Sequence, residues 1–237
     1  MREAKRVARM QAASWLKRNH IDYQHLSEKG RLELFKTAEN WCQDCFDFKP
    51  HAHLERLDKL TPKQQPMKVF IDSMWDWNSP GNESFWYDKI VSKMVECKQH
   101  EFLILSKNPA GYKMFAFPQD NIWLGTTVTS ELDSHRIAEL VNSTHTYGFG
   151  TNYLFISFEP LLGYVVIPNE LESVDWIIIG GLSRAGKEPQ QPDKEWVKDI
   201  LDFADIHDTP VYMKDNLIWE EPRKEFPHRM KHTFKEK

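Results

Sequence analysis

The sequence lacks the long apolar runs that a membrane protein needs. None of its hydrophobic stretches approaches the roughly 18 residues of a membrane-spanning helix. The first residues, MREAKRVARMQ, have no apolar core of the kind found in signal peptides. The formal net charge of −4 gives no overall attraction to nucleic acid. We therefore expect a cytoplasmic protein with no membrane partner, although a local basic face is still compatible with nucleic-acid binding.

Cysteine is also scarce, with three residues in a chain of 237. An odd and small number argues against a disulfide framework. Cys42 and Cys45 lie three residues apart, and in a reducing compartment this spacing favours a metal or redox role. A phosphate-binding loop has a lysine and a serine or threonine at fixed positions after its glycines. The pair Gly180-Gly181 is not followed by these residues at that spacing, so we exclude a nucleoside triphosphatase of that type.

Hydrophobic residues make up 41% of the chain and charged residues 28%, enough to build a core. Short apolar runs alternate with helical patterns, as strands buried on both faces of a parallel sheet do. The runs cover residues 67–72, 101–105, 121–127, 152–158, 174–179 and 210–213. We predict an α/β fold, namely a partial (β/α) barrel of about six parallel strands. A barrel is preferred to a doubly wound sheet because every strand ends in a candidate site residue rather than at one switch point.

Three regions are predicted along the chain: a helical, basic N-terminal arm over residues 1–40, the barrel over 41–217, and a loosely held, polar C-terminal tail over 218–237. The first nineteen residues carry six arginines and lysines against the single acid Glu3. A basic amphipathic helix can lie on nucleic acid, or it can simply present a solvated face.

The densest group of metal-binding side chains follows this arm. A C-x2-C pair, Cys42 and Cys45, lets two thiolates close on one metal or cluster. His51 and His53 could complete a Cys2His2 zinc set, although their H-x-H spacing is tighter than is usual in zinc fingers. The alternative is that the cysteines are ordinary buried thiols and the histidines cap the following helix.

Polar residues at the predicted strand ends form the candidate site. A carboxylate there can act as a base or bind hydroxyl groups, and a lysine can bind a carboxylate or phosphate or form a Schiff base. Our candidate catalytic residues are Asp72, Lys107, Glu159 and Lys214. Our candidate cofactor-binding residues are Asp76, Thr126, Gly180 and Gly181.

Several stretches in this order carry a family resemblance. They are CQDCF with the following FKPHAHLERL, then VFIDSMWD, HEFLILSKNP, NIWLGTTVTS, FISFEPLLG, VDWIIIGGLS and PVYMKDNL. Over about Trp41 to Leu217 the chain resembles the phage-associated radical-SAM-like proteins, most of them of unknown function. The resemblance implies a partial barrel whose cysteines hold a [4Fe-4S] cluster that binds S-adenosylmethionine and generates a radical. The phage setting of that family suggests a nucleotide or nucleic-acid substrate.

The chain departs from that pattern because only Cys42 and Cys45 stand in the loop, where the family has three cysteines. Cys97 is expected at the opposite end of the barrel. Either His51 or another residue supplies a third ligand, or the site holds zinc, or the fold persists without the radical chemistry. The sequence thus leaves three hypotheses: a radical-SAM-like enzyme or a degenerate member of that family, a non-catalytic zinc-stabilised protein that contacts nucleic acid or a protein partner, and a Schiff-base enzyme that uses Lys107 or Lys214.

Overall fold

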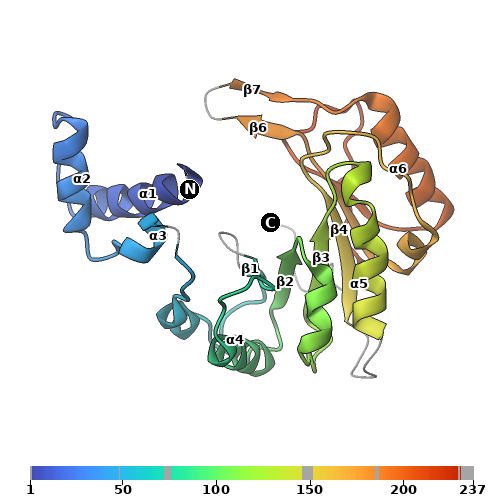
Figure 1. The fold of residues 1–237 in the computed structure, drawn as a ribbon, viewed down its shortest axis with the longest axis horizontal. Helices are drawn as coiled ribbons and strands as arrows, with labels where there is room; N and C mark the ends of the chain where they lie inside the picture. Colours follow the sequence, from blue (N-terminus) through green and yellow to red (C-terminus); the bar gives the residue numbers. More distant parts are fainter. Residues whose placement is uncertain are drawn as a thin grey trace. The chain divides into compact units, whose positions relative to one another are not determined.

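The computed structural model describes residues 2–47, 49–71, 76–145, 152–184, 187–228 and 230. The chain forms two compact units, Met1–His53 and Leu54–Lys237 (Figure 1).

The N-terminal unit contains α1 (Arg2–Arg18), α2 (Glu28–Lys36) and the short α3 (Gln43–Asp47). Ser27 begins α2 as its N-cap, where its hydroxyl accepts a hydrogen bond from Gly30 N at 3.2 Å. The unit has a small core, made of Ala12, Leu16, Phe35 and Ala38. A core of this size gives little hydrophobic stabilisation by itself.

This unit extends past residue 40, where the sequence analysis ended the arm. Trp41 packs against the small core, and Asn40 Nδ2 donates a hydrogen bond to Gln11 O at 2.7 Å. The loop that carries the cysteines and histidines therefore belongs with α1 and α2.

The second unit is built on a six-stranded parallel sheet with the order β1-β2-β3-β4-β5-β8. The strands are β1 (Lys68–Ile71), β2 (Glu101–Ser106), β3 (Ile122–Thr127), β4 (Tyr153–Phe158), β5 (Trp176–Ile179) and β8 (Val211–Met213). Each strand of this sheet lies beside its predecessor in the chain, and the sheet curls into a half-barrel (Figure 1). A doubly wound sheet would reverse its order at a switch point. The predicted partial barrel of six parallel strands is therefore confirmed.

Helices cover the convex face of this sheet (Figure 1). The α-helices are α4 (Ser84–Glu96), α5 (His135–His145) and α6 (Lys194–Ile206), with 3-10 turns η1 (Leu54–Lys59), η2 (Pro109–Met114), η3 (Glu131–Asp133) and η4 (Asn169–Ser173). The main hydrophobic core joins strand residues such as Ile104 and Ile156 to helix residues such as Met94, Leu140 and Ile200. Because side chains alternate along a strand, the residues between these face the concave side.

The concave face is aromatic near the start of the strands. Trp123 and Tyr153 stack there with ring centroids 4.5 Å apart, and Trp176 packs beside Phe155. The concave cluster also contains Met230, which is fully buried.

The segment after Leu217 covers this aromatic surface. Phe226 packs on Trp176 with ring centroids 5.6 Å apart, and Trp176 Nε1 donates a hydrogen bond to Glu225 O at 3.1 Å. The backbone of Lys224 forms an isolated antiparallel β-bridge with Tyr212 of β8. The described part of 218–230 is therefore packed on the sheet. The prediction of a loosely held tail was wrong for these residues, because the polar residues of this stretch outnumber Phe226 and Met230, which anchor it.

One element was not predicted. The strands β6 (Leu182–Arg184) and β7 (Lys187–Gln190) pair in antiparallel orientation, in a stretch where the sequence predicted no strand. No helix among the described residues is both long and apolar enough to cross a membrane.

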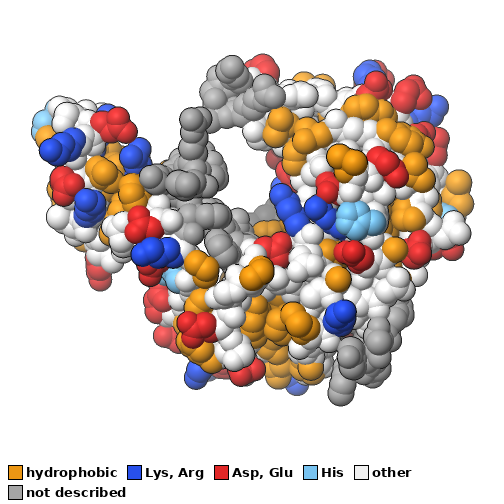
Figure 2. Space-filling model, in the orientation of Figure 1, with side chains coloured by type: hydrophobic (Ala, Val, Ile, Leu, Met, Phe, Trp, Pro, Cys, Tyr) orange, Lys and Arg blue, Asp and Glu red, His pale blue; other side chains and the backbone are white. Residues whose placement is uncertain are grey.

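Charge differs between the two units. Of the 31 lysines and arginines, 10 lie in residues 1–53 against 7 of the 35 acids, a net of +3. The remaining 21 basic and 28 acidic residues give residues 54–237 a net of −7. On the face shown in Figure 2, acidic and basic side chains are nevertheless interspersed, without a large field of one sign.

Candidate functional site

The four predicted metal ligands converge in the N-terminal unit. Cys42 directly precedes α3, Cys45 lies within it, and the chain then returns through His51 and His53. Cys45 Sγ lies 3.2 Å from His51 Nε2 and 3.1 Å from His53 Nε2, while Cys42 Sγ lies 3.4 Å from His51 Nε2. All four donor atoms lie within 4.8 Å of one another, and all four residues are partly buried.

This geometry fits a small tetrahedral ion. Zinc bonds of about 2.3 Å to sulfur and about 2.0 to 2.1 Å to nitrogen place tetrahedral ligand atoms roughly 3.3 to 3.8 Å apart. The pairs measured above, at 3.1, 3.2 and 3.4 Å, lie just below or at the lower end of that range. Two thiolates and two neutral imidazoles also form one of the common structural zinc sets.

Neighbouring backbone groups orient the ligands. His51 Nδ1 lies 2.8 Å from Lys49 O, so the Nδ1–H tautomer donates there and leaves Nε2 free to bind a metal. Cys45 N donates a hydrogen bond to Cys42 Sγ at 3.4 Å, which orients that side chain. The third cysteine, Cys97, is fully buried at the C-cap of α4 in the other unit, and burial raises the pKa of its thiol.

A second polar group forms where the half-barrel strands end. Glu159 follows β4 and Lys214 follows β8, and Lys214 Nζ lies 2.5 Å from Glu159 Oε2. The two strands are separated by β5, whose next residue is Gly180. A Cβ on Gly180 would lie only 2.9 Å from Glu159 Cγ, so the glycine leaves the space in which this ion pair forms.

The two glycines have structural roles. Gly181 N donates to Asn216 Oδ1 at 3.2 Å, and Asn216 Nδ2 donates back to Gly181 O at 2.7 Å. Gly180 N donates to Phe158 O, and Gly180 O accepts from Leu161 N. Their backbone groups are thus already paired within the protein, which leaves them poorly placed for the predicted contact with a cofactor.

Lys107 and Asp76 come together at the end of β2. Asp76 Oδ2 accepts a hydrogen bond from Lys107 N at 2.6 Å, and Asp76 Oδ1 accepts from Ser106 Oγ at 2.6 Å and from Asn78 N at 3.0 Å. Asp76 therefore fixes the loop that carries Lys107 rather than pointing a free carboxylate at a ligand. The Lys107 side chain itself is exposed.

Two predicted residues lie elsewhere. Thr126 is fully buried on the helix-covered face, and its hydroxyl donates to Ser106 O at 2.8 Å. It cannot line the concave face, because side chains alternate along β3 and its neighbour Thr127 occupies that face instead. Asp72 lies outside the described residues.

Asp133, which sequence reasoning missed, lies beside this strand end. Burial would raise the pKa of its carboxyl, but hydrogen bonds from Thr129 and the charges of Arg136 and Lys107 lower it overall. Thr129 Oγ1 donates to Asp133 at 2.5 Å, and Arg136 Nη2 lies 2.9 Å from it. The sequence offered only an S/T-x-x-x-D spacing in a polar turn, which is too common to single out.

The chain was compared with known proteins. Residues 8–236 match the model of a family described as "Protein of unknown function (DUF5131)". The chain belongs to this family. Neither the curated proteins nor the solved structures contain a match.

The family assignment corrects the resemblance drawn from the motifs. No radical-SAM family matches the chain, so that identification was wrong. Apart from the cysteine and histidine stretch, the motifs that suggested it are buried strands ending in polar residues, which a parallel half-barrel of any function produces. The loop also offers two thiolates and two imidazoles instead of the three thiolates that a [4Fe-4S] cluster requires.

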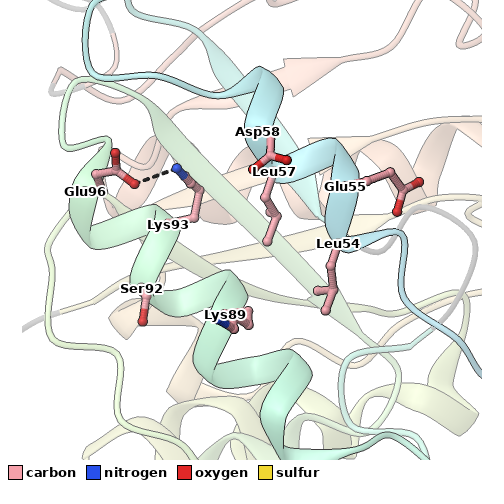
Figure 3. Close-up of a pocket in the computed structure, with 8 residues that line it drawn as sticks. All are labelled: Leu54, Glu55, Leu57, Asp58, Lys89, Ser92, Lys93 and Glu96. Atoms are coloured by element: carbon pink, nitrogen blue, oxygen red, sulfur yellow. Dashed lines mark hydrogen bonds and ion pairs between the residues drawn. The ribbon is translucent and has the colours of Figure 1, made fainter.

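A cavity of about 450 Å³ lies between η1 and α4 of the second unit (Figure 3). Leu54 and Leu57 line it together with charged residues, among them Lys93, whose Nζ lies 2.5 Å from Glu96 Oε2. None of the predicted site residues lines it.

Proposed function

We propose that this protein is a zinc protein, whose N-terminal unit is folded around a Cys2His2 centre made by Cys42, Cys45, His51 and His53. The observation that carries the proposal is the convergence of these four donor atoms within 4.8 Å. Zinc is favoured over harder ions such as magnesium because two of the donors are thiolates.

The centre serves the structure rather than a reaction. Four protein ligands fill a tetrahedral zinc site and leave no position for water or a substrate, which distinguishes structural from catalytic zinc. The unit around it spans 53 residues and has only a few buried core side chains. Small units of this kind commonly depend on a metal for their stability, because zinc binding supplies folding free energy.

The metal would join the loop to the helices. Arg9 Nη1 of α1 lies 3.4 Å from Glu28 of α2, and the Arg9 guanidinium lies 5.9 Å from the ring centre of Phe46 in α3. A zinc ion would bind α3 to the segment His51–His53 and so fix the position of α3 relative to α1 and α2. The net charge of +3 of residues 1–53 keeps nucleic acid, or an acidic protein, as the predicted partner of the folded unit.

Metal analysis tests the proposal. We expect one zinc per chain in the full-length protein, and the loss of most of it in Cys45→Ala and His51→Gln. Cys97→Ala and His25→Gln are the matched controls, because these residues lie outside the centre, and both should retain zinc. Equal zinc content in all four variants, or no zinc in the wild-type protein after loading and dialysis, would refute the proposal.

A further inference from the structure

Three polar residues form a row across the concave face of the half-barrel. Thr127 of β3 is the register partner of Ser157 of β4. Lys107 directly follows Ser106, which is the register partner of Thr126. Lys107, Thr127 and Ser157 therefore lie side by side at the carboxyl ends of three adjacent strands, and they replace the aromatic and aliphatic residues found lower on the same face.

The two hydroxyl groups of this row are unpaired within the part of the chain that the structure describes. Thr127 is 5% exposed and Ser157 4% exposed, yet neither side chain forms a hydrogen bond with another described residue. Neighbouring polar side chains are paired: the hydroxyl of Thr126 donates to Ser106 O, and that of Ser106 donates to Asp76. Neither hydroxyl oxygen is among the fully buried, unpaired side-chain atoms of the described residues, so both remain accessible to a ligand from the concave side.

Lys107 adds a positive charge at one end of the row. Its backbone is held by Asp76, while its side chain is exposed. The nearby carboxylate of Asp133 is already neutralised by Arg136 at 2.9 Å and accepts two hydrogen bonds from Thr129. Above the row, Glu159 and Lys214 balance each other's charge. The charge of Lys107 acts on Asp133, but Lys107 forms no ion pair within the described part of the chain, so its ammonium group can bind an anion.

We propose that Lys107, Thr127 and Ser157 bind the anionic group of a small molecule. A carboxylate or a phosphate would accept hydrogen bonds from the Lys107 ammonium group and from both hydroxyls, which satisfies all three donors at once. The adjacent Glu159–Lys214 pair would meet hydroxyl or amino groups on the rest of the molecule. Carboxyl ends of parallel strands are where barrel proteins place such sites. The proposal is independent of the zinc centre, which lies in the other unit.

Thermal unfolding of the full-length, zinc-loaded protein in the presence of simple anions tests it. Inorganic phosphate and acetate are titrated separately, with sodium chloride at matched ionic strength as the reference. We expect one of the two anions to raise the unfolding temperature of the half-barrel beyond the chloride reference in a saturable manner. The anion that raises the unfolding temperature shows whether the site binds a phosphate or a carboxylate.

Variants then locate the effect. Lys107→Gln and Thr127→Val should each weaken the apparent affinity about tenfold or more, as expected for the loss of a hydrogen bond to a charged group. Thr127→Ser restores the hydroxyl and should bind as the wild type does. Lys113→Gln, an exposed lysine of nearby η2, is the matched control and should leave the affinity unchanged. A shift no larger than that in chloride, or an equal shift in Lys107→Gln and wild type, would overturn the proposal.

Discussion

The ion pair between Glu159 and Lys214 depends on the small size of the residue between them. Gly180 lies between them, and a methyl group there would contact Glu159 at 2.9 Å and Asn216 at 3.1 Å. We predict that Gly180→Ala lowers the free energy of unfolding by about 1 to 3 kcal/mol, because the added group overpacks a filled site. Urea denaturation of the half-barrel measures this loss.

Gly30 provides the control for that substitution. A Cβ there would meet its nearest atoms at 3.4 and 3.5 Å, which is ordinary contact, and the residue lies within α2. Gly30→Ala should leave its own unit unchanged or stabilise it by up to about 1 kcal/mol, since alanine favours a helix. A similar loss of stability in both variants would contradict the explanation by steric contact.

We expect ionisation of the Asp175 carboxyl to lower the free energy of unfolding of the half-barrel. Burial raises the pKa of its carboxyl, and a hydrogen bond from Leu154 N at 2.7 Å offsets part of that effect. Since the folded state holds this proton more tightly than the unfolded state, stability falls as the pH rises from the unfolded pKa through the folded one. Asp175→Asn keeps the hydrogen-bond acceptor and removes the charge.

We therefore expect Asp175→Asn to unfold at higher urea concentration than the wild type at pH 7, and the difference to shrink as the pH is lowered towards 4. Exposed Asp208 gives the control, since Asp208→Asn carries the same change in charge without burial. A variant of Asp175 that is less stable than the wild type at pH 7 would show that the carboxylate is needed in its charged form.

At this scale the sequence predicted residue types better than their orientation. It singled out Lys107, Glu159 and Lys214, which the structure places at one edge of the sheet. It chose Thr126 for the site, while Thr127 is the residue on the concave face. Successive side chains of a strand point to opposite faces of the sheet, so only one of the two threonines can face the concave side. When a strand is apolar on both faces, the sequence does not show which residue that is.

At the scale of elements, the strands were predictable because each is a short apolar run bounded by polar residues. The hairpin of β6 and β7 was not, because sequences such as LSR and KEPQ have little strand character. The C-terminal segment was also missed. Its attachment depends on Phe226 and Met230, two apolar residues in a polar stretch, and their long-range contacts leave no local pattern.

The attachment of this segment can be tested at Met230. The side chain is fully buried against the concave aromatic cluster, so Met230→Ala should lower the free energy of unfolding by about 2 to 5 kcal/mol, the usual range for a large-to-small core change. Met114 belongs to the same unit but is 69% exposed, and Met114→Ala should have a much smaller effect. Equal effects of the two substitutions would mean that the segment is not packed in solution.

At the scale of the whole molecule, the chain combines a small basic unit with a larger acidic half-barrel that has its own extensive core. If zinc folds only the first, chelation should unfold residues 1–53 and leave the half-barrel intact. Limited proteolysis in the presence of a chelator should then cleave α1 and α2 while a fragment beginning near Leu54 persists. Simultaneous digestion of both units would contradict this independence.

The zinc centre itself is tested most directly by X-ray absorption at the zinc edge of the full-length protein. Our account predicts a first shell of two sulfur atoms at about 2.3 Å and two nitrogen atoms at about 2.0 to 2.1 Å. His51→Gln should lose one nitrogen or lose the metal, whereas His25→Gln should give the wild-type spectrum. A shell made only of nitrogen and oxygen, or one with a different number of sulfur atoms, would contradict the assignment of Cys42, Cys45, His51 and His53 as the ligands.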